Sequence, residues 1–356
     1  MIPLVHPCVE ADDLHILQQY GKQDSFKNSK LKLENEFADF LGYKYAIAVT
    51  SGTAALHLAL LALGITNDDE VICPSYTCTA ILNSILYTGA KPVFTDIAMN
   101  VQNSDFSMDL LHARANITER TKALIFTHMF GKAIDLDEFK SLNIPLIEDA
   151  TLSLGAVSKN NRKAGSKGDI SIVSLHESKM ISAIAGGVLC TSNEVYYHAA
   201  LEYLESTSHS KLFHLRYNYE MPPIHAALAI NQLQKLPKFI ERRLQLASLY
   251  KEKLMAYKHV LELPELMDDN IFFRYMVQLK EGITPESILS QGLEYRIQFG
   301  RGVYPSLHQY TGISNELFPN TTEAVQTMLS IPLYPALTDS EALHILDTLI
   351  HILMKK

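Results

Sequence analysis

Short apolar segments alternate with longer segments of helical periodicity through the first two thirds of the chain. Segments that predict strands lie at 45–50, 70–73, 91–96, 123–127, 145–148, 170–175 and 188–191. Helices are predicted at 11–20, 31–41, 54–63 and 79–87, and Gly42 and Gly64 stand where two of them should end. Because nearly continuous apolar strands alternate with helices, the pattern predicts an α/β fold whose parallel or mostly parallel sheet is covered on both faces.

The pattern changes near residue 220. Helical periodicity extends over 222–236 and 238–257, and Pro237 is expected to interrupt it because proline lacks the N–H that a helix interior needs. A strand is then predicted at 272–279, with helices at 285–291 and 341–354. We therefore expect a large domain over 1–235 and a smaller α+β domain over 236–356, closely packed because no flexible linker separates them.

Composition and charge narrow the class of protein. The 356 residues are 47% hydrophobic and 20% charged, as in ordinary globular proteins, and the net charge of −8 disfavours a nucleic-acid partner. No signal-peptide pattern begins the chain, and no apolar run reaches the ~18 residues of a membrane helix. The histidines lack metal-binding spacing, so no metal is expected. The cysteines form no CxxC pair, which favours free thiols and a cytoplasmic location: Cys8, Cys73, Cys78 and Cys190.

Polar residues gather where the predicted strands end, and ligands of such sheets bind at the carboxyl ends of the strands. Ser51-Gly52-Thr53 joins a strand to a helix. The N–H groups of such a turn can bind an anion, although an ordinary capped helix has the same sequence. Because neither a GxGxxG fingerprint after a strand nor a GxxxxGK[ST] P-loop occurs, a dinucleotide or ATP cradle is disfavoured.

Ionisable residues follow two further strands. Glu148-Asp149 ends a buried segment, where the acids either cap a helix or face a cationic group of a ligand. Lys179 comes after the segment 170–175 and is either a surface lysine or an amine in a partly dry pocket that can condense with an aldehyde. Asn218, before the helix at 222–236, is by itself a turn or N-cap residue.

Taken together, these segments resemble the DegT/DnrJ/StrS family of sugar aminotransferases, which use pyridoxal 5′-phosphate (PLP) and have fold type I. The resemblance runs through almost the whole chain in the same order. It rests on the segments 51–60, 69–77, 89–96, 147–150, 168–169, 174–179, 186–187, 217–219, 226–227, 232–233 and 333–335. The implied architecture is aspartate aminotransferase-like, with a large domain that binds PLP and a small C-terminal domain.

The resemblance implies roles for single residues. Lys179 stands where the family lysine binds PLP covalently, and Asp149 where an aspartate pairs with the pyridine nitrogen. Asn218 matches an asparagine that reaches the phosphate of the neighbouring subunit's cofactor, which implies a homodimer with composite active sites. The positions that match phosphate-binding residues are Gly52, Thr53, Ala54 and Ser174.

Several positions depart from the family pattern. Leu152 replaces a Gln or His that touches the phenolic oxygen of the cofactor, and leucine cannot hydrogen-bond. Cys78 replaces the aromatic residue that stacks on the ring, so the ring must pack differently. Glu220 replaces a basic residue, and Ile184-Ala185 replaces Gly-Glu or Gly-Asp. These changes leave Lys179 in place and put the substrate and the tuning of the cofactor in question.

The implied reaction moves an amino group from an amino acid, by analogy glutamate, to a keto sugar that is expected to be nucleotide-linked. The segment 296–308 matches the region that shapes the sugar site, and Arg301, Tyr304 and His308 are either substrate contacts or domain-packing residues. Three alternatives remain. A related sugar dehydratase usually has histidine in place of Lys179, a PLP-binding regulatory protein would lack turnover, and an α/β enzyme of another class would bind no PLP.

Overall fold

The computed structural model describes residues 1–19, 26, 28–204, 215–280 and 282–355. Its centre is a seven-stranded sheet of order β1-β7-β6-β5-β4-β2-β3. Strands β2 to β6 pair in parallel, while β7 runs antiparallel to both β6 and β1. The prediction of a mostly parallel sheet is thus confirmed. The strands are β1 Tyr45–Val49, β2 Glu70–Pro74, β3 Lys91–Thr95, β4 Thr121–Thr127, β5 Leu146–Asp149, β6 Ile170–Ser174 and β7 Gly187–Thr191.

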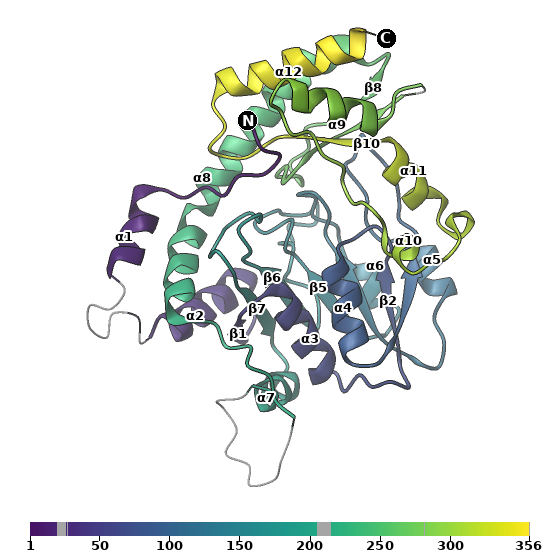
Figure 1. Ribbon diagram of the computed structural model, residues 1–356. Coiled ribbons are helices and arrows are strands. Elements are labelled where there is room, and N and C mark those ends of the chain that lie inside the picture. The colour runs from purple at the N-terminus through teal and green to yellow at the C-terminus, as the bar shows by residue number, and fades with distance from the viewer. Residues whose placement is uncertain (20–25, 27, 205–214, 281, 356) are drawn as a thin grey trace.

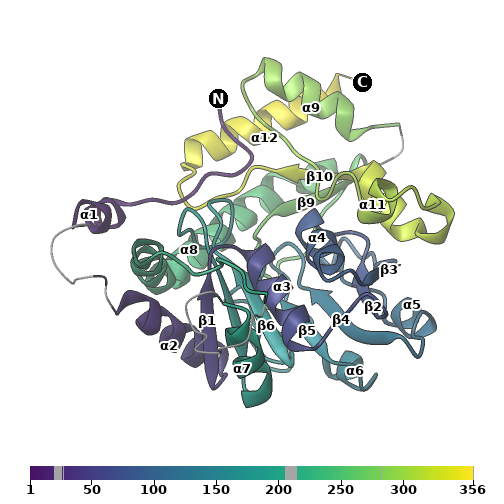
Figure 2. The ribbon, with the colours of Figure 1, turned by 60° about the horizontal axis from the view of Figure 1, so that its bottom comes forward.

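Alternate residues of the strands bury against helices on opposite faces of the sheet. In β1, Ile47 and Val49 belong to the core under α3 (Gly52–Ala62), α4 (Thr79–Tyr87) and α7 (Glu194–Glu202). Ala46 and Ala48 belong to the core under α2 (Ser29–Leu41) and α8 (Pro223–Leu254). Figures 1 and 2 show these two helical layers on either side of the sheet. The covered sheet explains why its strands are almost continuously apolar.

The other helices lie close to their predicted positions. Helix α1 covers Ala11–Gln19, and Tyr20 of the predicted segment lies outside the described residues. Gly42 ends α2 with φ of 80°, as a left-handed C-cap requires. The described helices that the sequence pattern did not predict are short, with at most nine residues each. They are α5 Leu110–Ala115, α6 Asp137–Lys140, α7, α10 Leu307–Tyr310 and α11 Pro319–Thr327.

Helix α8 corrects one prediction, because it continues through Pro237 without a break. Proline removes one backbone hydrogen bond from a helix interior. The apolar face of α8 is buried on both sides of that point, with Leu233 and Leu236 before it and Phe239 after it. Tertiary packing therefore holds the two halves of the segment in line and outweighs the local cost.

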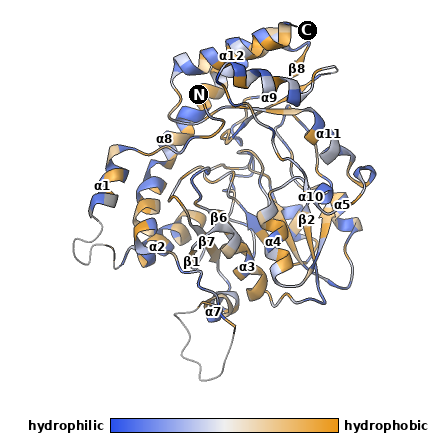
Figure 3. Ribbon diagram, in the orientation of Figure 1, coloured by the Kyte–Doolittle hydropathy of each residue, from blue (hydrophilic) through white to orange (hydrophobic). Residues whose placement is uncertain are grey.

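A second sheet lies beyond α8. Its three antiparallel strands, in the order β10-β9-β8, cover Met328–Ile331, Tyr275–Leu279 and Leu261–Glu262. Helices α9 (Pro285–Glu294) and α12 (Asp339–Met354) pack beside it at the end of the molecule that holds both termini (Figure 1). Figure 3 shows hydrophobic and hydrophilic stripes along α12. Helix α8 passes through residue 235, and the division into 1–235 and 236–356 stays a prediction.

Within the described part of the chain, no helix is both long and apolar enough to cross a membrane. No group of histidine, cysteine, aspartate and glutamate side chains suited to a metal ion occurs among the described residues either.

Candidate active site

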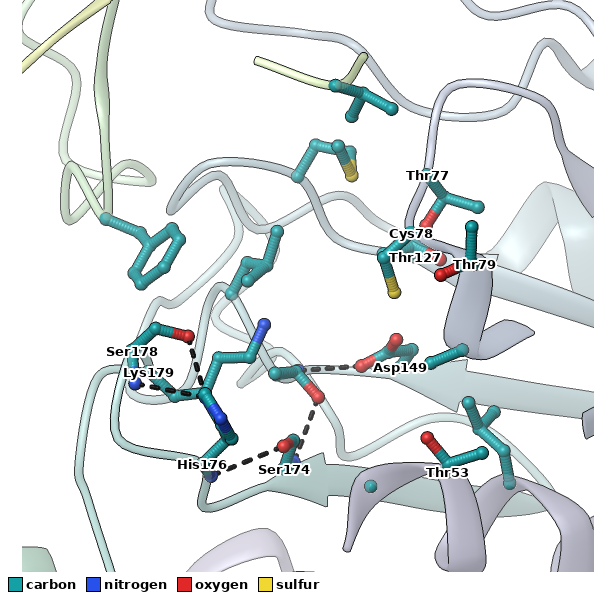
Figure 4. Close-up of a pocket in the computed structure, with 18 of the residues that line it drawn as sticks. Thr53, Thr77, Cys78, Thr79, Thr127, Asp149, Ser174, His176, Ser178 and Lys179 are labelled. Atoms are coloured by element: carbon teal, nitrogen blue, oxygen red, sulfur yellow. Dashed lines mark hydrogen bonds between the residues drawn. The ribbon is translucent and has the colours of Figure 1, made fainter. Parts of the chain in front are cut away.

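A cavity of about 640 Å³ lies at the carboxyl ends of β1, β2, β4, β5 and β6, where the sequence predicted a ligand site. Residues of the C-terminal part of the chain, near 273 and within 302–310, also line it. The structure brings seven of the predicted site residues to its wall: Gly52, Thr53, Cys78, Asp149, Ser174, Lys179 and Tyr304. Figure 4 shows most of these side chains around one space.

The first turn of α3 packs directly against the end of β6. A Cβ atom added to Gly52 would lie 2.6 Å from Cβ of Ser174 and 3.0 Å from its hydroxyl oxygen. Only glycine therefore lets the helix start approach the Ser174 hydroxyl so closely. The side chain of Ser51 caps this helix and accepts the N–H of Ala54 at 3.0 Å. Ala54 is buried and is not part of the cavity wall. Because its N–H already donates to Ser51, this group has an intramolecular partner.

Asp149 is the carboxylate of this cavity. It is buried at the end of β5, and its Oδ1 accepts the N–H of Thr151 at 2.9 Å. Burial raises the pKa of Asp149 above its usual value, while the bond from Thr151 and the nearby charge of Lys179 act in the opposite direction. A buried carboxylate of this kind is stabilised by a cationic group beside it.

Lys179 faces the same space from the loop after β6. Its backbone N–H donates to the carbonyl of His176 at 3.0 Å, within a turn that also holds Ser178. The side chain is half-buried and extends toward the middle of the cavity, with Asp149 and Cys78 across the space from it (Figure 4). Its amine forms no hydrogen bond with the described residues, which leaves it available to a ligand.

Three other predicted residues lie elsewhere. Asn218 is exposed and is not part of the cavity wall. Arg301 pairs with Glu286 and donates from Nη1 to the carbonyl of Val325 at 3.0 Å. His308 is fully buried, and its two ring nitrogens lie 2.7 Å from Oγ of Ser75 and 2.9 Å from Oδ1 of Asn315. For Arg301 and His308 the geometry favours the packing alternative, whereas Tyr304 is 63% exposed at the cavity.

Comparison with known proteins identifies the family. The model of the DegT/DnrJ/EryC1/StrS aminotransferase family matches residues 9–350. This chain belongs to that family. It is 31% identical to GDP-perosamine synthase from Escherichia coli O157:H7 over 330 residues, which are 89% of this chain and 88% of that protein. It is 34% identical to GDP-perosamine synthase from Caulobacter vibrioides over 267 residues, 71% of this chain and 70% of that protein.

A solved structure has the same fold. NtdA from Bacillus subtilis, with bound cofactor PMP, matches with a TM-score of 0.85 over 97% of this chain and 83% of that chain, at 24% identity. The predicted fold type I architecture of this aminotransferase is therefore confirmed.

The cavity of this aminotransferase fits a cofactor of that kind. A vitamin B6 phosphate needs an acid for its ring nitrogen, an amine for its aldehyde and donors for its phosphate. Asp149 and Lys179 meet the first two needs, and the start of α3 with the Ser174 hydroxyl meets the third. Thr127 adds a hydroxyl oxygen that is buried at the cavity wall without a hydrogen-bond partner in the described chain.

The departures from the family pattern also lie at this wall. Leu152 and Cys78 both line the cavity, so an apolar side chain and a thiol stand where the resemblance led us to expect a polar and an aromatic side chain. Sequence reasoning missed Thr127, Thr151 and Arg274, which line the cavity too. For Arg274 a signal exists, because it is a charged residue inside the apolar segment 272–279, although a strand residue with its side chain in solvent looks the same.

Proposed function

We propose that this protein transfers an amino group from an amino acid, by analogy glutamate, to the keto group of a nucleotide-linked sugar. The cofactor is pyridoxal 5′-phosphate, which carries the amino group between the two substrates. One observation carries the proposal: an amine and a buried carboxyl group, Lys179 and Asp149, line one cavity beside a helix start that suits a phosphate.

Each residue has a distinct task. The amine of Lys179 would hold the cofactor until the amino donor takes the place of this amine. The freed amine would then move the proton of the donor α-carbon to the cofactor. Asp149 keeps the pyridine nitrogen protonated, and the cationic ring in turn removes the cost of burying this carboxylate. Gly52, Thr53 and the hydroxyl of Ser174 hold the phosphate at the start of α3.

The acceptor is proposed from relatives. Both relatives named above are, by their names, synthases of GDP-perosamine, and this chain covers most of their length. Tyr304 and Tyr310 stand at the cavity wall and are 63% and 57% exposed. We place the sugar on this side, opposite the phosphate of the cofactor.

A homodimer with composite active sites completes the proposal. Asn218 is exposed in the segment that leads to α8 and is not part of its own cavity wall, which leaves its amide available to a second copy of the chain. The family resemblance supports the proposal that this amide reaches the cofactor phosphate of the partner. We also propose a cytoplasmic location, which agrees with free thiols at all four cysteines.

The two half reactions can be followed separately by absorbance. L-Glutamate added to the PLP-loaded protein should replace the absorption of the PLP form with that of the PMP form, and a GDP-linked keto sugar should restore it. A PLP-binding regulatory protein would leave the spectrum unchanged in the first step. A dehydratase would consume the sugar without taking nitrogen from glutamate, and either result would contradict the proposal.

A further inference from the structure

Arg274 places a guanidinium group at the wall of the cavity. It is half-buried just before β9, among Phe130, Phe273 and the segment that contains Gly302. Burial lowers the pKa of Arg274 from its usual value, although the group keeps its charge at neutral pH. A cation in such an apolar setting is costly unless an anion neutralises it.

The described chain supplies no such anion to Arg274. Its Nη1 donates to two neutral carbonyl oxygens, those of Arg301 at 2.9 Å and Gly302 at 3.3 Å. Its Nε is buried without a hydrogen-bond partner. Both side-chain hydrogen bonds of Arg274 in the described chain start from Nη1, which leaves Nη2 without one. The guanidinium therefore keeps one edge, formed by Nε and Nη2, without an internal partner.

Two neighbouring arginines are satisfied differently. Arg301 pairs with the carboxylate of Glu286. Arg243 is buried away from the cavity, where Nη1 donates to the carbonyl oxygens of Phe273 and Leu333, both at 2.9 Å. Among the arginines of the described chain, Arg274 alone combines a place at the cavity wall with a free guanidinium edge.

We propose that Arg274 binds the α-carboxylate of the amino donor through this edge, an inference that rests on the proposed function. A planar guanidinium and a carboxylate match in a bidentate geometry, and the apolar neighbours Phe130 and Phe273 strengthen the pair by lowering the local dielectric. Asp149 is the one acidic side chain in the described wall, and it is assigned to the ring nitrogen. The carboxylate must therefore come from a ligand.

The other anions of the reaction fit this position less well. The cofactor phosphate has its own donors at the start of α3 and at Ser174. The diphosphate of a nucleotide sugar carries more negative charge than one guanidinium neutralises, and the described wall offers no second guanidinium. A single carboxylate balances the charge of Arg274 one to one.

Binding of glutarate to the PLP-loaded protein, measured by titration calorimetry, tests the site without turnover. Arg274→Met should weaken binding roughly 30-fold or more, the usual cost of removing one partner from a buried charge pair. The affinity of Arg274→Lys for glutarate should lie between those of the unaltered protein and Arg274→Met, because a lysine amine is a point charge and cannot bind a carboxylate in a bidentate way. The control Arg114→Met removes an exposed arginine of α5 and should bind as the unaltered protein does.

A second experiment uses the amino donor itself. Single-turnover spectra are recorded with L-glutamate and with its α-carboxamide, which lacks the α-carboxylate. The unaltered protein should prefer glutamate strongly, and Arg274→Met should lose most of that preference by slowing glutamate alone. If Arg274→Met binds glutarate and reacts with glutamate as the control does, the inference is wrong. It is also wrong if inorganic pyrophosphate, and not glutarate, binds in an Arg274-dependent way. If glutarate binding depends on Arg274 while no amino acid changes the spectrum, the carboxylate site stands and the proposed function fails.

Discussion

Nε2 of His128 lies 2.8 Å from Oε1 of Glu148, and both side chains are fully buried behind the cavity. Since Nδ1 of His128 accepts the N–H of Ile134 at 3.2 Å, the ring proton is on Nε2, and this N–H donates a hydrogen bond to the carboxylate. The carboxylate also accepts three backbone N–H groups at 2.7 Å, those of Gly165, Lys167 and Gly168. Together these bonds fix the loop beside the end of β5, next to Asp149.

Replacing His128 by alanine should destabilise the protein by about 3 kcal/mol or more, because a buried carboxylate loses its side-chain donor. The matched control is His198→Ala, which removes an exposed histidine 3.7 Å from Glu194 and should change the free energy of unfolding by less than ~0.5 kcal/mol. Urea unfolding of both variants measures the difference. Equal losses in the two variants would show that the buried pair does not hold the loop.

His57 should make stability depend on mild acid. Burial lowers its pKa to about 4 from the usual 6.5. The unfolded chain therefore takes up a proton below pH 6.5, while the folded protein leaves this ring neutral until about pH 4. Because the unfolded state binds more protons in this window, stability falls as the pH drops through it, by roughly 2 to 3 kcal/mol from this residue.

The variant His57→Gln should flatten that decline between pH 6.5 and 4, whatever its effect on stability at neutral pH. The exposed His198→Gln serves as the control and should keep the slope of the unaltered protein. Urea unfolding at a series of pH values gives both slopes. An unchanged slope in His57→Gln would mean that the imidazole titrates normally in the folded protein.

Gly52→Ala should weaken cofactor binding roughly tenfold, because the new methyl group would meet Ser174 at 2.6 Å and push the start of α3 away. Gly42→Ala provides the comparison. There φ is 80° and nothing lies within 4 Å of the added atom, so the change costs backbone strain of about 1 kcal/mol and should leave cofactor affinity intact. Titration of PLP into the apoprotein measures both. If Gly52→Ala binds PLP with full affinity, the cofactor phosphate does not bind at this turn.

Mixing two inactive variants tests the composite site. Heterodimers of Lys179→Ala and Asn218→Ala should regain one working site of two, because one cavity then combines an intact Lys179 with an intact Asn218 from the partner. Heterodimers of Lys179→Ala and Asp149→Asn should regain none, since both residues serve the cavity of their own chain. Activity after unfolding and refolding the mixtures together provides the measurement. Recovery in the second mixture, or none in the first, would contradict the arrangement.

Local signals were enough to predict much of the fold and part of the site. The strands of the large sheet are buried on both faces, so their apolar character is visible in the sequence, and glycines such as Gly42 mark the ends of helices. Gly52, Asp149 and Lys179 follow predicted strands, and strand ends of a parallel sheet meet at one edge. Their convergence therefore follows from the order of strands and helices along the chain.

Contacts between distant segments could not be read in the same way. Pro237 is a local helix breaker, and its neighbours in α8 stay helical because Leu236 and Phe239 are buried against other elements. Arg301 and Arg274 look alike in sequence, yet Glu286 neutralises the first and nothing in the described chain neutralises the second. Which arginine faces the cavity depends on how the C-terminal segments pack over the sheet.

The central claim is that the side-chain nitrogen of Lys179 is joined to the cofactor. Borohydride reduction of the PLP-loaded protein, followed by peptide mass spectrometry, tests that bond directly by making it permanent. We expect a single modified peptide with the added mass on Lys179, and no such adduct in a Lys179→Ala variant treated alike. An adduct on another lysine, or none on a protein that holds PLP, would contradict it.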